Sequence, residues 1–152
     1  HSLNPSMPTA LPSRWLDLEI LCSAPMLFAL VGMDARADSS PAPGTLFGLG
    51  KNQHATDQPL GSVALAFETA VGDMQPMQSL AASSQGGIWA PRAAIYPRTL
   101  MGFARHGRPI PEPILELTTR IRADTVVNPA QDLTLKQDVA LDGSLVLDLR
   151  YL

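Results

Sequence analysis

The sequence is poor in the residues that build disulfide frameworks, thiolate metal sites and strongly charged surfaces. It has one cysteine, Cys22, in 152 residues, which excludes an intramolecular disulfide and a cysteine-rich zinc site. Charged residues make up 16% of the chain, against roughly 25% in typical soluble domains. The formal net charge of −3 indicates no strong overall attraction to nucleic acid or to anionic membranes.

The sequence also lacks an apolar run that is long enough to cross a bilayer. The most apolar stretch is LEILCSAPMLFALVGMDARADSS, residues 18–40. Its uncharged part, from Ile20 to Met33, spans 14 residues, whereas a membrane helix needs about 20. We therefore expect no membrane span.

The same stretch has some parts of a secretion signal, which leaves the compartment open. Arg14 precedes the apolar run, and the triplet Ala-Arg-Ala at residues 35–37 follows it as a cleavage site would. Asp17 and Glu19, however, stand where a signal carries positive charge, and Pro25 interrupts the run. We favour a segment of the core or of a subunit interface, with a secretion signal as the alternative.

Alternating apolar residues predict a mainly β structure. Leu16, Leu18 and Ile20 alternate with other residues at the period of a strand. Strands are expected at residues 16–21, 26–31, 61–69, 99–105 and 114–127. The stretch 26–31 is apolar on both faces, which is typical of a central strand, and no segment shows an amphipathic helix of ten residues.

The connections between these strands are rich in proline, glycine and serine. Residues 34–51 read as a long loop, and residues 74–97 as mostly irregular chain that allows a short helical turn at Gln78–Ser83. Residues 107–113, GRPIPEP, cannot be helical because three prolines occupy alternate positions.

The C-terminal sequence LTLKQDVALDGSLVLDLRYL predicts a β-hairpin around Asp142-Gly143. A three-residue loop pairs Leu141 with Leu145 and Val139 with Leu147, so that the large apolar side chains share one face. A two-residue loop separates them onto two faces, because a slip of one residue reverses every side chain. We favour the three-residue loop.

Together these patterns predict one β-rich domain over residues 14–152, preceded by an extended N-terminal arm over residues 1–13. The expected architecture is an antiparallel sandwich or small barrel with long Pro/Gly-rich loops, ending in the C-terminal hairpin. The arm is assigned because residues 1–13 are rich in Pro, Ser and Asn and show no periodicity.

Few residues point to catalysis or to a cofactor. The glycine-rich segment 48–51, GLGK, is followed by Asn52 rather than the Ser or Thr of a phosphate-binding loop, so we interpret it as a turn. Cys22 lies in the most apolar segment, where a thiol usually acts as a small hydrophobe. His54 and His106 have no indicated third ligand for a metal. The sequence therefore indicates no cofactor and no catalytic residue.

One segment has an unusual charge distribution. No acidic residue occurs from Met74 to Pro111, and nine of the eleven basic residues of the chain are arginine. The candidate interface residues in this segment are Arg92, Arg98, Arg105 and Arg108, interleaved with Trp89, Tyr96 and Phe103. Because the arginine fork suits carboxylates and phosphates, the segment fits a contact with an acidic protein patch. It also fits arginines that bond their own loop carbonyls. A nucleic-acid backbone is the least favoured partner because the chain is acidic overall.

The favoured function is a non-enzymatic structural subunit of a larger assembly, for example a virion component such as a head decoration or capsid-associated protein. Low charge favours this because charged residues are depleted at interface cores. We expect a homo-oligomer or an association with other subunits, in a virion or in the cytoplasm. The alternative is a secreted or periplasmic β-domain that binds a ligand or protein partner. A small enzyme that uses His54 or His106 is a third hypothesis.

Overall fold

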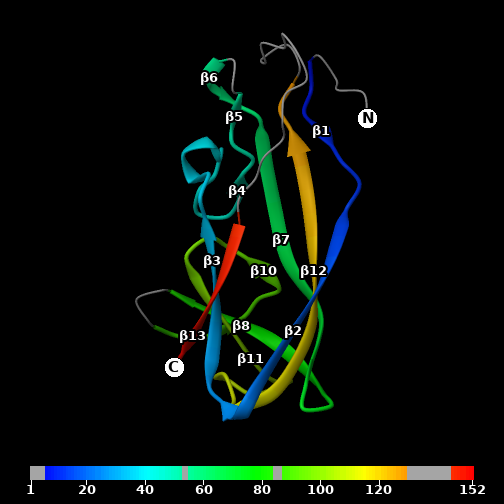
Figure 1. Ribbon diagram of the computed structural model, residues 1–152, viewed down its shortest axis with the longest axis vertical. Helices are drawn as coiled ribbons and strands as arrows, with labels where there is room; N and C mark the ends of the chain where they lie inside the picture. Colours follow the sequence, from blue (N-terminus) through cyan, green and yellow to red (C-terminus); the bar gives the residue numbers. More distant parts are fainter. Residues whose placement is uncertain (1–5, 53–54, 84–86, 130–144) are drawn as a thin grey trace.

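The computed structural model describes residues 6–52, 55–83, 87–129 and 145–152, and these residues form a mainly β protein (Figure 1). Its elements are β1 (Thr9–Ala10), β2 (Arg14–Met26), β3 (Phe28–Asp34), the short 3₁₀ helix η1 (Ala37–Ser39), β4 (Phe47–Gly48), β5 (Lys51–Asn52), β6 (Ala55–Pro59), β7 (Gly61–Gly72), β8 (Gln75–Ser83), β9 (Ala90–Pro91), β10 (Ala94–Ile95), β11 (Thr99–Arg105), β12 (Ile114–Val127) and β13 (Leu145–Tyr151). Within these ranges no helix is long and apolar enough to cross a membrane.

The long strands form one antiparallel sheet. Its order is β12–β7–β8–β11–β3–β13, and β1 and β2 both pair with the edge of β12 that faces away from β7. The short strands β4 and β10 pair with β7, and β9 pairs with β8. Strands β5 and β6 form a separate two-stranded sheet.

The strands expected from alternating residues are confirmed. Strand β12 has the predicted bounds, with Leu117 and Ile121 buried on one face and Thr118 and Arg120 exposed on the other. The pattern at residues 99–105 corresponds to β11, and those at residues 16–21 and 61–69 lie within the longer strands β2 and β7.

The prediction for residues 74–97 is wrong. The segment expected to allow a helical turn is strand β8, and β9 and β10 also fall in the stretch expected to be irregular. The sequence of β8, QPMQSLAAS, has no β-branched residue, so local propensity gives little signal for a strand. Its conformation is set by pairing with β11, from Thr99 opposite Ser83 to Arg105 opposite Met77.

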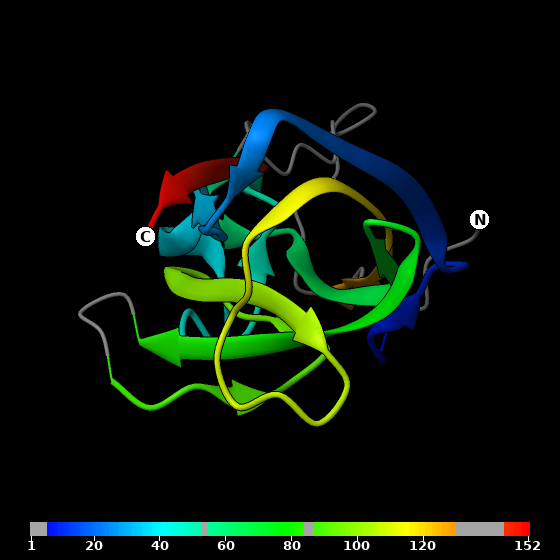
Figure 2. The same ribbon diagram turned by 90° about the horizontal axis from the view of Figure 1, so that it is seen from below.

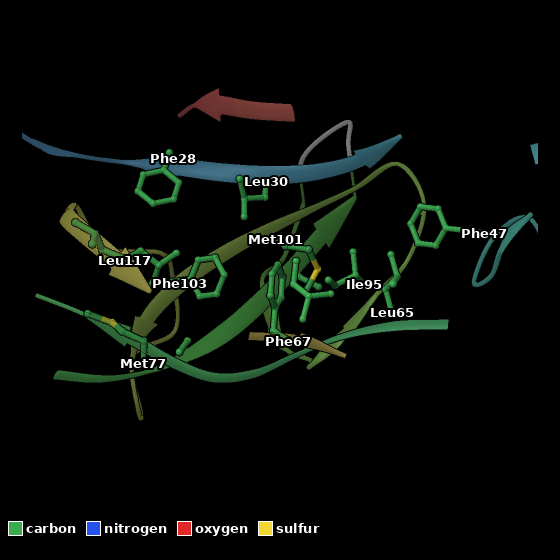
Figure 3. Packing of buried hydrophobic residues seen from close by; sticks show 14 residues of the cluster. Phe28, Leu30, Phe47, Leu65, Phe67, Met77, Ile95, Met101, Phe103 and Leu117 are labelled. Atoms are coloured by element: carbon green, nitrogen blue, oxygen red, sulfur yellow. The ribbon is translucent and has the colours of Figure 1, made fainter. Parts of the chain in front are cut away.

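The sheet curls around one main hydrophobic core (Figure 2). Phe28 of β3 and Leu117 of β12 belong to the same buried cluster, although β7, β8 and β11 separate their strands within the sheet. Figure 3 shows side chains from these strands converging on Phe103, whose ring meets that of Phe67 edge-on with centroids 5.0 Å apart. This arrangement agrees with the expected sandwich-like fold.

Strand β3 is buried on both faces, as its uninterrupted apolar sequence predicted. Alternate residues face the main core, and Ala29 and Val31 belong to a second cluster with Ala82 and Leu100. Trp89 packs against this second cluster from outside the sheet. Residues 28–34 of the apolar stretch are therefore a central strand of the core, whereas residues 20–26 belong to β2.

The C-terminal strand β13 pairs with β3. Its register runs from Leu145 opposite Asp34 to Tyr151 opposite Phe28. Leu147 is half-buried and packs against the main core. The first strand and the loop of the predicted hairpin fall in residues 130–144, which lie outside the described residues.

Part of the predicted N-terminal arm lies along the chain's own sheet. Thr9 and Ala10 form β1 and pair with Val127 and Val126. The amide of Leu11 then donates a hydrogen bond of 2.9 Å to the carbonyl of Thr125. The first strand of the chain thereby extends the same edge of β12 that β2 occupies.

Candidate interaction surfaces

Arg92 is half-buried and connects the segment between β9 and β10 to the start of β11. Its guanidinium lies over the ring of Tyr96, with Cζ 3.9 Å from the ring centroid. Its Nε donates to the carbonyl of Ala94 at 3.0 Å, and its Nη2 donates to Thr99 Oγ1 at 3.1 Å. This arginine bonds neutral oxygens of its own loop, which was one of the interpretations left open by the sequence.

Arg105 and Arg108 lie near one carboxylate at the connection between β11 and β12. The guanidinium of Arg105 donates to both oxygens of Glu112, at 3.1 and 2.9 Å, and its backbone amide donates to Oε1 at 2.9 Å. The Nε of Arg108 is 4.0 Å from Glu112 Oε2. The hydrogen bonds from the Arg105 side chain, followed by the one from its amide, lower the pKa of Glu112 to about 2.

Arg98 is the arginine of the predicted set whose guanidinium has no partner among the described residues. It is exposed and sits in a turn from Tyr96 to Thr99, in which the amide of Thr99 is 3.4 Å from the carbonyl of Tyr96. The amide of Arg98 donates to the carbonyl of Gly32 in β3 at 2.8 Å. Its guanidinium forms no hydrogen bond or ion pair with any residue that the structure describes. We call Tyr96–Thr99, with the guanidinium of Arg92 stacked on it, the arginine turn.

The three aromatic residues of the predicted interface lie in different environments. Phe103 is 1% exposed and belongs to the main core, so the prediction that it forms part of a contact surface is wrong. Trp89 is half-buried against the outer face of β11, where a Cβ on Gly102 would lie 2.4 Å from Pro111 Cγ and 3.4 Å from Trp89 Cζ3. Trp89 and Pro111 therefore cover the strand at Gly102. Of the predicted set, the structure gathers Arg92, Tyr96 and Arg98.

A second charged surface was not found from the sequence. It is the outer face of β2, β12 and β7, which we call the acidic face, and it carries Asp17, Glu19, Glu68, Glu116 and Asp124 together with Arg120 and Arg122. Asp17 pairs with Arg120 at 3.1 Å. Arg122 bridges Glu68 at 2.9 Å and Asp124 at 3.0 Å. The two arginines are thus already neutralised by carboxylates of the same face.

Two carboxylates of the acidic face form no ion pair within the described ranges, although Arg120, which pairs with Asp17, is also a diagonal neighbour of Glu19. Glu19 lies opposite Thr118 and Glu116 lies opposite Leu21, so the two glutamates are diagonal neighbours on adjacent strands. Both are exposed, and neither forms an ion pair with a residue in the described ranges. Like charges in this position repel each other. A cation from outside the chain would relieve that repulsion.

The acidic face is hollowed at a β-bulge. The pairing of β12 with β7 shifts between Thr118 and Arg120, and Thr69 of β7 has a φ of 49° there. An open groove of about 590 Å³ lies at this point, and its charged walls are Asp17, Glu19 and Glu68 together with Arg120, which pairs with Asp17. The groove therefore presents carboxylates to solvent.

Strand β2 forms the border of this surface. It pairs with β12 along one edge, and no described strand pairs with its other edge. Three large apolar side chains of β2 are more than half exposed: Trp15 at 52%, Leu16 at 65% and Leu21 at 70%. Asp17 and Glu19 stand between them in the sequence.

The structure places three of the other features that were singled out in the sequence: the glycine-rich segment, Cys22 and His106. The amides of Gly48 and Gly50 donate to Asp34 Oδ2 and Ser39 Oγ at 2.9 Å each, which agrees with a structural turn. Cys22 is half-buried and packs against the main core. His54 lies outside the described residues. His106 is exposed in the connection between β11 and β12, and the described part of the chain holds no group of three or more metal-ligating side chains.

Comparison with known proteins gives no relative: no family model, no curated protein and no solved structure matches the chain. Interpretation of the two surfaces therefore starts from their charges and geometry. Among the described residues, the arginine turn offers a cation that forms no ion pair, and the acidic face offers two carboxylates that form none.

Proposed function

We propose that this protein is a non-enzymatic structural subunit that assembles with further copies of itself. The observation that carries the proposal is strand β2, which is 13 residues long and has no described strand along its outer edge. Such an edge presents unpaired N–H and C=O groups, and soluble proteins usually shorten, charge or cover it. The exposed Trp15, Leu16 and Leu21 on this strand support a surface that is covered in an assembly.

The composition supports the same proposal. Charged residues are 16% of the chain, and low charge is characteristic of surfaces that become the core of an interface. A component of a virion is the narrower form of the proposal. It fits a small β subunit with long connections, such as the β11–β12 connection around Pro111.

The second candidate function is a secreted or periplasmic domain that binds a ligand. The groove on the acidic face favours it, because about 590 Å³ lies within the range of small-molecule sites. Its carboxylates suit a cationic ligand. This candidate takes first place if the purified chain does not associate with itself.

The test is the solution mass of the full chain, measured by light scattering coupled to size exclusion over a wide concentration series. The proposal expects masses that are multiples of 16.2 kDa and that increase with concentration. Leu21→Ser should lower the associated fraction and leave the melting temperature unchanged, because Leu21 is 70% exposed. Ile110→Ser, at 60% exposure and away from β2, is the matched control. A monomer of 16.2 kDa at every concentration would overturn the proposal.

A further inference from the structure

The arginine turn departs from the residue preferences of its own backbone. Pro97 occupies the second position of the turn, and Arg98 occupies the third with a φ of 59°. A turn of this pattern is type II, in which the third position needs a positive φ and is normally Gly or Asn. A long L-residue is strained in this conformation. Arg98 therefore holds a position where glycine would be more stable.

The hydrogen bond from the Arg98 amide to the carbonyl of Gly32 holds the backbone of the turn, but no described contact of the Arg98 side chain compensates for the strain. The guanidinium of Arg98 is exposed and has no partner among the described residues. Local strain that the fold does not require is found most often at functional sites. The side chain of Arg98 is therefore better explained by a contact outside the monomer than by the stability of the turn.

Arg92 adds a second cation to the same turn. Its guanidinium contacts Tyr96 and Thr99, the residues at the two ends of the turn that holds Arg98. Its described hydrogen-bond acceptors are a carbonyl, a hydroxyl and the sulfur of Met101, all of them uncharged. Two arginines at one turn, with no described carboxylate beside them, form a site for an anionic group, and the planar fork suits a carboxylate or a phosphate.

The acidic face supplies carboxylates of the matching kind. Glu19 and Glu116 are exposed diagonal neighbours that form no ion pair with a described residue, because the nearby Arg120 pairs with Asp17. An antiparallel pairing of β2 with β2 of another copy that is centred near Leu18 would set Asp17 and Glu19 opposite or diagonal to the same residues of the second copy. Like charges in those positions are destabilising, so this face fits an unlike, basic surface.

The arginine turn and the acidic face of one copy cannot meet. The turn precedes β11 and is hydrogen-bonded to β3, whereas the acidic face lies on β2, β12 and β7. In the sheet, β7 and β8 separate β12 from β11, and in Figure 1 β3 and β12 run on different sides of the view, while β2 meets β3 only at the lower end, where the two strands follow each other in the chain. The two charged surfaces can therefore be joined only between copies.

We propose that the arginine turn of one copy binds the acidic face of the next, with Arg98 received between Glu19 and Glu116. This inference rests on the proposed self-assembly and specifies its contact. The contact joins two different surfaces, so it is heterologous, and its repetition gives a closed ring or an open filament. Because it is formed by exposed charges, it should weaken as salt concentration rises.

The test uses charge reversal on each surface. The Arg98→Glu and the Glu19→Arg/Glu116→Arg chains should each self-associate about tenfold more weakly than the wild type, as seen by sedimentation equilibrium. A mixture of the two variants should recover association, because the reversed turn of one chain meets the reversed face of the other. Arg150→Glu is the matched control, since Arg150 is also exposed and has no described partner. It should associate as the wild type does.

A second variant separates stability from binding. Arg98→Gly suits the positive φ of the turn, so it should raise the melting temperature while it weakens association. Weak association of Arg98→Glu has a second explanation if that variant is misfolded. Arg98→Gly removes this explanation, because it is expected to be more stable than the wild type. Unchanged association of Arg98→Gly would overturn the proposed contact.

The outcomes distinguish the two proposals. If the wild type associates but neither salt nor Arg98→Glu weakens it, self-assembly stands and the arginine contact is wrong. If the reversed variants fail to associate in the mixture although each is folded, the pairing of these two surfaces is also wrong. If the wild type is monomeric at every concentration, the self-assembly proposal and the contact fail together.

Discussion

The packing of Trp89 and Pro111 on β11 predicts that Gly102→Ala destabilises the fold. The added Cβ would lie 2.4 Å from Pro111 Cγ and 2.9 Å from Pro111 Cβ, distances at which the ring must move. Inserting a methyl group into a packed site costs about 1–3 kcal/mol. Replacing glycine by alanine also lowers the conformational entropy of the unfolded chain, and this stabilises the folded state by about 0.4–1 kcal/mol. The net expectation is a loss of about 1–2 kcal/mol, or about 2–8 °C in melting temperature for a domain of this size.

The assay is thermal and urea unfolding followed by circular dichroism. Gly44→Ala is the matched control, because no atom lies within 4 Å of a Cβ added there. It should be neutral or stabilising by up to about 1 kcal/mol. Pro111→Ala removes the Cγ, so Gly102→Ala should cost less in that background. If Gly102→Ala melts like the wild type, or costs the same with and without Pro111, then Pro111 and Trp89 do not cover β11 as described.

Two further predictions concern the turn between β7 and β8 and the ion pair beside Pro111. Met74 has a φ of 67° and is 94% exposed, so Met74→Gly should relieve backbone strain and stabilise the protein by about 0.5–1 kcal/mol. Gln75→Gly, in the adjoining strand, should destabilise it by a similar amount, and a loss of stability in Met74→Gly would contradict the turn geometry. The pKa of Glu112 is lowered from 4.5 to about 2, so its ion pair stabilises the fold above pH 4.5 and loses this effect as pH falls toward 2. The melting temperature of Glu112→Gln should therefore lie below that of the wild type above pH 4.5 and meet it near pH 2. A difference that stays constant across that range would show that Glu112 does not titrate as described.

Strands with one buried and one solvated face could be predicted from the sequence. In β12, inward and outward side chains alternate from Glu116 to Asp124 as the pattern predicts, but Leu115, expected on the face of Leu117, is exposed because the pairing with β2 shifts between Ile114 and Glu116. Strand β8 could not be predicted because small and polar residues fill it, and its pairing with β11 comes from residues some twenty positions away. The burial of Phe103 could have been predicted from its own strand. Its alternation with Met101 in β11 indicates an inward ring, but the interleaving with arginine suggested a surface.

The acidic face shows why surfaces are harder to predict than strands. Asp17 and Arg120 are each placed on a polar face by the alternation in their own strands. Their pairing depends on the register of β2 against β12, across 103 positions in the sequence. The same register brings Glu19 and Glu116 together. Neither segment contains a signal for its partner, so the excess of carboxylates becomes visible only when the strands are side by side.

The arginine turn is the case in which sequence and structure together say more than either alone. The sequence shows Pro97 before Arg98, which marks a turn but does not determine its type. The structure shows a positive φ at Arg98, where the turn type favours glycine. A sequence usually agrees with its fold at each level, and a side chain that departs from this agreement without an internal contact of its own is expected at a functional position. Arg92 fits the interpretation of arginines that bond their own loop, whereas Arg98 does not. The two interpretations of the arginine segment therefore apply to different residues, and Arg98 is the position at which a contact with a carboxylate should be sought first.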